Sequence, residues 1–177
     1  MSLVLRMERV PTAIGTMLVL TDDAGRLRVL DWEDYESRLQ HLLRLHYGDD
    51  VTLSEGGGSS DVRRALEAYF AGDLHAIDRI CVETGGTAFQ RQVWAALRRI
   101  PVGQTLSYGA LARRIDRPRS VRAVGLANGA NPVSIVVPCH RVIGADASLT
   151  GYGGGLERKR WLLEHEGVLL SERRRAA

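Results

Sequence analysis

The chain has 177 residues, of which 45% are hydrophobic and 25% charged, and its formal net charge is +3. This composition is typical of a globular protein, and no apolar stretch approaches the roughly 18 residues that a membrane span needs. Charge interrupts the first residues too early for a signal peptide. We therefore expect a cytoplasmic protein without a membrane partner, whose two cysteines, Cys81 and Cys139, stay reduced.

The first half of the chain predicts the strands of a small α+β unit. Apolar residues 3–10 and 17–20 flank a turn at 11–15, which indicates a hairpin, and the alternation over 27–31 indicates a third strand. Residues 77–82 predict one more strand.

Two helices are predicted within this first half. Apolar residues recur at helical spacing over 39–46, and a second helix begins at Asp61 as its cap and ends just before Gly72. The glycine- and serine-rich stretch 56–60 predicts a flexible loop. We find no chemistry in this half, including in its histidines.

The second half of the chain predicts helices with clear start signals. Thr87 and Gln90 form a capping box for a helix that ends before Pro101, and Ser107 caps a helix over 108–115. Further helices are predicted over 119–128 and 156–166. The expected domains are residues 1–84, an α+β structural domain, and residues 85–170, a mostly helical functional domain, followed by a basic tail at 171–177.

Positive charge is concentrated in one part of the chain. Residues 107–128 contain five arginines and a single acid, Asp116. Two short helices around a tight turn, rich in arginine, fit a helix-turn-helix, and the local charge favours a polyanionic partner. A solvated helix face is the alternative explanation of such a cluster.

A reactive cysteine is predicted in the segment 131–144. Residues 135–137 indicate a short buried strand that Pro138 cannot continue, so Cys139 falls at a turn beside His140 and Arg141. A free thiol titrates near about 8.5, and neighbouring cations lower that value. The alternative is a small buried hydrophobic residue, as many free cysteines are, but His140 and Arg141 are costly neighbours for an inert core position.

The run from Asn131 through Pro138-Cys139-His140-Arg141-Val142-Ile143-Gly144 resembles the active-site signature of the O6-alkylguanine-DNA alkyltransferases, also called methylated-DNA–protein-cysteine methyltransferases. The similarity extends to Ser107-Tyr108-Gly109, to Arg122-Ala123-Val124-Gly125 and to Gly151–Gly155. It implies a ribonuclease H-like first domain and a DNA-binding second domain with a helix-turn-helix.

The resemblance implies a set of catalytic residues. Cys139 receives the alkyl group, His140 takes its proton through a water, and Glu166 orients His140. Asn131 fixes the turn and links it to Glu166, while Tyr108 donates to guanine N3. Since a thioether is a poor leaving group, each molecule is expected to react once.

The resemblance also implies residues that bind DNA and the damaged base. Arg122 fills the gap left by a nucleotide rotated out of the helix, which is required because guanine O6 is out of reach inside the stack. The Val142 carbonyl selects guanine, Tyr152 packs on the base or alkyl group, and the Gly153 N–H donates to O6. Ser107, Ala123 and Gly125 belong to the element that enters the minor groove.

The expected function is therefore direct-reversal repair of O6-alkylguanine, and less efficiently O4-alkylthymine, in double-stranded DNA. The expected protein is a monomer that needs no cofactor and no metal. Three alternatives remain: a lesion-binding protein without chemistry, a cysteine hydrolase, and a helix-turn-helix transcription factor. The presence of Cys139 argues against the first, and no signature of an acyl-transfer site precedes it, which argues against the second.

Overall fold

The computed structural model of the protein describes residues 2–56 and 60–170. It divides into two compact units: one runs to Gly86 and includes the returning segment Pro132–Val136, and the other comprises Thr87–Asn131 and the chain from Val137 onwards. The mixed α+β class expected from the sequence is confirmed. The expected tail 171–177 and the centre of the loop 56–60 lie outside the described residues. Within the described ranges, no helix combines the length and apolarity needed to cross a membrane.

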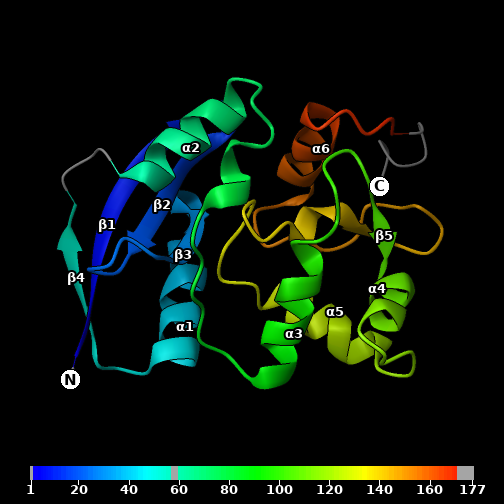
Figure 1. Cartoon of the computed structure of the whole chain (residues 1–177), viewed down its shortest axis with the longest axis horizontal. Helices are drawn as coiled ribbons and strands as arrows, with labels where there is room; N and C mark the ends of the chain where they lie inside the picture. Colours follow the sequence, from blue (N-terminus) through cyan, green and yellow to red (C-terminus); the bar gives the residue numbers. More distant parts are fainter. Residues whose placement is uncertain (1, 57–59, 171–177) are drawn as a thin grey trace. The chain divides into compact units, whose positions relative to one another are not determined.

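A four-stranded sheet forms the first unit (Figure 1). Its strands are β1 (Leu3–Thr12), β2 (Gly15–Thr21), β3 (Leu27–Trp32) and β4 (Val51–Glu55). Their order is β3-β2-β1-β4, with β2 antiparallel to both β1 and β3 and with β4 parallel to β1. The predicted hairpin and third strand are confirmed. The sequence pattern missed β4, because four of its five residues are exposed and an edge strand of this kind shows no apolar alternation.

Two helices contact this sheet, α1 (Glu36–Tyr47) against β3 and α2 (Asp61–Phe70) against β1. Both were predicted. A core cluster joins the sheet to α1 and comprises Leu5, Leu18, Leu20, Val29, Leu39 and Leu43. The predicted cap of α2 was wrong by one residue: the Ser60 side chain accepts the Arg63 N–H, and Asp61 is the first helical residue.

The strand predicted over residues 77–82 was wrong. Ala76–Arg79 forms a short 3₁₀ helix, η2, and only Val82 makes a bridge, to Leu27. The buried residues Ile77 and Ile80 are three positions apart, which is a helical spacing and not the alternation of a strand. A second 3₁₀ turn, η1 (Glu33–Tyr35), precedes α1.

Helices dominate the second unit. They are α3 (Ala88–Leu97), α4 (Tyr108–Arg114), α5 (Val121–Gly129), the 3₁₀ turn η3 (Cys139–Arg141) and α6 (Leu156–His165). The predicted capping box at Thr87 and Gln90 and the cap at Ser107 are both confirmed. α3 ends earlier than expected, since Arg98–Ile100 form a turn before Pro101. α6 ends at His165, and the turn that follows it contains Gly167, whose φ is 84°.

A two-stranded parallel pair ties two distant segments of this unit together. β5 (Leu106–Ser107) pairs with β6 (Val142–Ile143), so that Leu106 lies opposite Val142 and Ser107 opposite Ile143. β5 leads directly into α4, and β6 follows η3 directly. The pair therefore fixes the start of α4 relative to the Cys139 turn.

The buried strand predicted over 135–137 was wrong. The Val136 N–H donates to the Ser134 carbonyl at 2.8 Å around Ile135, whose φ is 69°, so this stretch is a γ-turn with a left-handed centre. Leu30 exchanges two backbone hydrogen bonds with Pro132 and Ser134. A single bridge to β3, rather than a strand, thus holds the segment.

Candidate active site

Cys139 lies at a tight turn built by Pro138. With φ −80° and ψ 66°, Pro138 is the centre of an inverse γ-turn in which the Cys139 N–H donates to the Val137 carbonyl at 2.8 Å. The Asn131 side chain donates to the same carbonyl, also at 2.8 Å. Cys139 is 6% exposed and begins η3, so the chain reverses direction within a few residues of the thiol.

A buried network of charges surrounds Glu166, the residue that follows α6. His140 Nε2 lies 2.9 Å from Glu166 Oε1, and Arg141 donates to both carboxylate oxygens from Nε and Nη2, each at 2.9 Å. Arg141 Nη1 donates to the Ile100 carbonyl at 2.6 Å. The side chains of His140 and Glu166 are fully buried. A carboxylate at a helix C-terminus is disfavoured by the helix dipole, and Arg141 offsets that cost here.

The ionisation states in this network follow from its geometry. Burial alone would raise the pKa of Glu166, but the hydrogen bonds and charge of His140 and Arg141 outweigh burial and hold that pKa well below its usual range. Burial lowers the pKa of His140, against the opposing pull of Glu166. The pair at neutral pH is therefore a carboxylate and a neutral imidazole.

This arrangement determines which nitrogen of His140 carries the proton. An ionised carboxylate can only accept hydrogen bonds, so Nε2 donates to Glu166 and Nδ1 presents its lone pair. Nδ1 is buried and has no hydrogen-bond partner among the described residues. His140 is thus held in the tautomer of a base.

Four further expected residues lie in the same unit. Tyr108 is half-buried at the start of α4, and its hydroxyl accepts a hydrogen bond from Thr150 Oγ1 at 3.5 Å. Val142 is buried at the start of β6. Tyr152 and Gly153 are half-buried in the loop that precedes α6.

Lys159 is a site residue that sequence reasoning missed. It is fully buried in α6, and its ammonium donates to the Val142 and Thr150 carbonyls at 2.6 and 2.7 Å. The spacing of Lys159, Leu162 and Glu166 on one buried helix face was the available signal. It was hidden because Lys159 stands within a run of charged residues.

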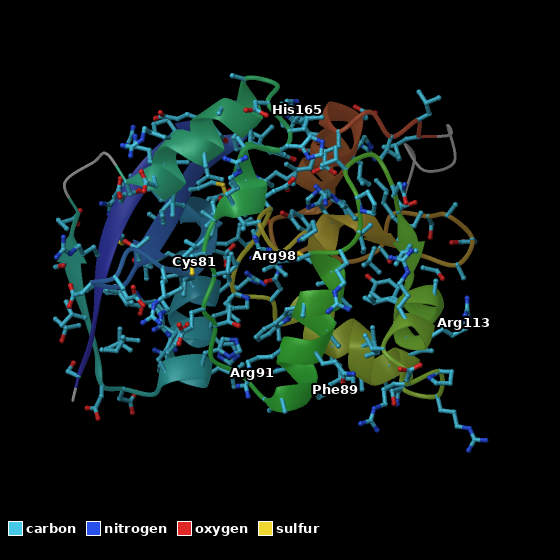
Figure 2. The ribbon with its side chains drawn as sticks, viewed as in Figure 1. Cys81, Phe89, Arg91, Arg98, Arg113 and His165 are labelled. Carbon is cyan, nitrogen blue, oxygen red and sulfur yellow. The ribbon has the colours of Figure 1, made fainter. Side chains whose placement is uncertain are left out.

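The expected DNA-binding residues lie on α4 and α5, apart from the buried network. Arg122 and Ala123 are exposed on α5, and Gly125 is half-buried, where an added Cβ would meet the Tyr108 ring at 3.8 Å. Arg122 forms no hydrogen bond or ion pair with any described residue. Ser107 caps α4 and accepts the Ala110 N–H. Figure 2 labels three exposed arginines of this unit: Arg91 on α3, Arg98 directly after α3, and Arg113 on α4.

Comparison with known proteins agrees with this arrangement. Residues 88–168 match the family model described as 6-O-methylguanine DNA methyltransferase, DNA binding domain. The chain is 53% identical over 167 residues to the methylated-DNA–protein-cysteine methyltransferase of Salmonella typhimurium, with 92% of this chain and 96% of that one covered. It is 56% identical over 155 residues to the protein of that name from Mycobacterium tuberculosis, with 88% and 84% covered.

The fold comparison gives the same answer. The crystal structure of Mycobacterium tuberculosis OGT in complex with DNA matches with a TM-score of 0.74 and 38% identity, covering 92% of this chain and 93% of that one. Identity of this size over nearly the whole of both chains leaves one conclusion. The chain belongs to the methylated-DNA–protein-cysteine methyltransferase family.

Proposed function

We propose that this chain repairs alkylated DNA by moving a methyl or other alkyl group from guanine O6, and less efficiently from thymine O4, to its own Cys139. The observation that carries the proposal is the Cys139 turn, where the thiol directly precedes an imidazole that a buried carboxylate holds as a base. The family relatives carry the name of the same reaction.

The chemistry is a displacement at carbon. His140 Nδ1 takes the Cys139 proton through a water, the thiolate attacks the alkyl carbon, and the bond from that carbon to guanine O6 breaks with its electron pair going to the base. Tyr108 donates a hydrogen bond or a proton to guanine N3 as this charge builds. The product is a thioether, which cannot be displaced again under mild conditions, so the protein is consumed.

Recognition of the base uses the walls around Cys139. The backbone carbonyls of Cys139 and Val142 accept from the exocyclic amine of guanine, which thymine lacks. The Gly153 N–H donates to O6, and Tyr152 packs against the base or its alkyl group. Asn131 supports this pocket indirectly, because its side chain holds the carbonyl to which the Cys139 N–H is bonded.

DNA binding is proposed for α4 and α5 acting as a helix-turn-helix. α5 enters the minor groove with Ala123 and Gly125 against the DNA backbone, and Arg122 fills the space left by the rotated nucleotide. Ser107 fixes the start of α4.

The partner is double-stranded DNA bound by a monomer in the cytoplasm, without a cofactor or metal. Residues 1–84, with a ribonuclease H-like arrangement, serve as a structural domain, and residues 85–170 form the functional one.

The proposal is tested by intact-protein mass spectrometry after incubation with a duplex that carries O6-methylguanine. We expect a gain of one methyl group per protein, located on Cys139 by peptide mapping, and no second turnover with excess DNA. Binding to the duplex without any mass gain would instead support a lesion-binding protein without chemistry. Many methyl groups removed per protein would contradict the single-use mechanism.

We expect Arg122→Ala to slow repair of duplex DNA by about tenfold or more, equivalent to about 1.4 kcal/mol. Without the arginine side chain, nothing fills the space that the rotated nucleotide leaves in the duplex. Single-turnover kinetics on a duplex measure this effect. Reaction with free O6-benzylguanine needs no base rotation and should keep its rate. Arg64→Ala, which removes an exposed arginine from α2, is the charge-matched control and should leave both rates unchanged. An equal loss on the duplex and the free base would contradict this role.

A further inference from the structure

Lys159 is an unusual residue for the interior of a protein. It is fully buried, and its ammonium donates to three backbone carbonyls: Val142 at 2.6 Å, Thr150 at 2.7 Å and Gly151 at 3.4 Å. No carboxylate of the described residues pairs with it. Buried lysines are rare unless paired, since an isolated buried charge carries a large desolvation cost. A group retained at that cost invites a functional explanation.

The three carbonyls belong to the two segments that border Cys139. Val142 follows η3 directly and begins β6, while Thr150 and Gly151 directly precede Tyr152 and Gly153. The stretch Gly151–Gly155 is called the glycine-rich loop here. One ammonium therefore connects the end of the Cys139 turn to the start of this loop. Thr150 also donates from its side chain to the Tyr108 hydroxyl, which brings the start of α4 into the same set of contacts.

The charge of Lys159 acts on Cys139 as well. Burial lowers the pKa of Lys159 to about 8, and the electrostatic attraction of Cys139 opposes that shift. Such an attraction is mutual: a thiolate that stabilises the ammonium is itself stabilised by it. Because a pKa of about 8 lies above neutral pH, Lys159 remains mostly protonated there.

The other groups around Cys139 leave Lys159 as the dominant charge. Arg141 and Glu166 neutralise each other through two hydrogen bonds, and His140 is neutral. The remaining charged side chains on the packed elements are exposed or half-buried and so are screened by solvent. They are Arg91 on α3, Arg98 and Arg99 just after it, Arg113 and Arg114 on α4, and Glu157, Arg158, Arg160 and Glu164 on α6.

We propose that Lys159 is a positioning residue for alkyl transfer: its ammonium ties the Cys139 turn to the glycine-rich loop and supplies the positive charge that favours the thiolate. The role in transfer rests on the proposed function. The role in thiolate formation does not, and it can be measured without DNA.

The experiment follows the reaction of Cys139 with iodoacetamide as a function of pH, in a Cys81→Ala background that leaves one thiol. Lys159→Gln retains an amide donor for the carbonyls but removes the charge, Lys159→Met removes both, and Lys159→Arg keeps the charge. We expect the pH of half-maximal reactivity to rise by about one unit in the Gln and Met variants, with about a tenfold lower rate at pH 7. The Arg variant should stay within about 0.3 units of the parent.

Single-turnover repair of an O6-methylguanine duplex provides the second arm. The Gln and Met variants should lose about tenfold in rate while their Kd for the duplex stays the same. Thermal unfolding of each variant identifies those that are folded. A folded Lys159→Gln protein with the parental pH profile would overturn the proposal, because the tether alone would then explain the residue.

A measurement on the parent protein covers the case in which the neutral variants do not fold. A nearby cation favours the anionic reagent iodoacetate over neutral iodoacetamide. The ratio of the iodoacetate rate to the iodoacetamide rate should therefore be higher at Cys139 than at the exposed Cys81. The ratio at Cys139 is measured in Cys81→Ala, and the ratio at Cys81 in Cys139→Ala. Equal ratios at the two thiols would overturn the proposal. If the parent shows the thiol behaviour but takes no methyl group from DNA, the proposed function fails and the electrostatic inference stands.

Discussion

Replacing Cys139 by alanine is expected to abolish alkyl transfer completely while leaving DNA binding intact. No other described thiol lies in this unit, and without sulfur there is no atom to form the thioether. Cys139 lies in the buried turn and not on the exposed face of α5, so the proposed DNA contacts are untouched. The measurement is intact-protein mass spectrometry with an O6-methylguanine duplex, paired with a binding titration on the same duplex.

The second cysteine of the chain offers a matched control. Cys81 is exposed, so Cys81→Ala should retain a gain of one methyl group at the parental rate. Both substitutions remove a single small group, and each should change the free energy of unfolding by no more than about 1 kcal/mol. A methyl group found on the Cys139→Ala protein would show that another residue accepts it.

Local signals explain why most helices could be predicted. The starts of α3 and α4 are specified by side chains that bond to the backbone three residues on, Thr87 to Gln90 and Ser107 to Ala110. Such signals lie within a single turn and need no knowledge of the rest of the fold. β4 could not be found in this way, because its pairing with β1 depends on residues about fifty positions away.

The catalytic turn shows where apolar pattern alone fails. Residues 135–137 are apolar and buried as expected, but burial here comes with a left-handed Ile135 and not with a strand. For a β-branched residue this conformation is strained, and only the surrounding contacts can maintain it. Sequence pattern reports which side chains avoid water and does not report the backbone geometry that buries them.

The candidate site divides in a similar way. The resemblance pointed to His140 and Glu166, which the fold brings to 2.9 Å of each other. It did not point to Lys159, nor to the two hydrogen bonds that Arg141 donates to Glu166. Whether a charged residue is buried depends on the tertiary structure. For a charged residue on a helix, the sequence indicates burial only when the residue falls at the spacing of the apolar face.

Glu166→Gln is expected to destabilise the protein by about 3–5 kcal/mol, the usual result of removing one partner from a buried ion pair. The substitution conserves shape but leaves Arg141 with an uncompensated charge in the interior. It also replaces an acceptor-only group with an amide, which can donate to His140 and thereby favour the wrong tautomer. We therefore expect slower single-turnover repair even where the variant is fully folded.

The pH dependence of this effect has a defined sign. The pKa of Glu166 is lowered in the folded protein, so its stabilising contribution is complete above its unfolded value of 4.5 and is lost as the pH falls below that value. The difference between the parent and Glu166→Gln should therefore be largest near pH 7 and should shrink below about pH 4.5. Urea unfolding at a series of pH values measures it.

Glu164→Gln is the matched control, because Glu164 is exposed in the last turn of the same helix. It should change the free energy of unfolding by less than about 0.5 kcal/mol at any pH in the series. A Glu166→Gln protein as stable as this control at pH 7 would mean that the carboxylate contributes no net stability. The buried network would then have to be explained by the tautomer of His140 alone, which the rate of repair in the two variants would reveal.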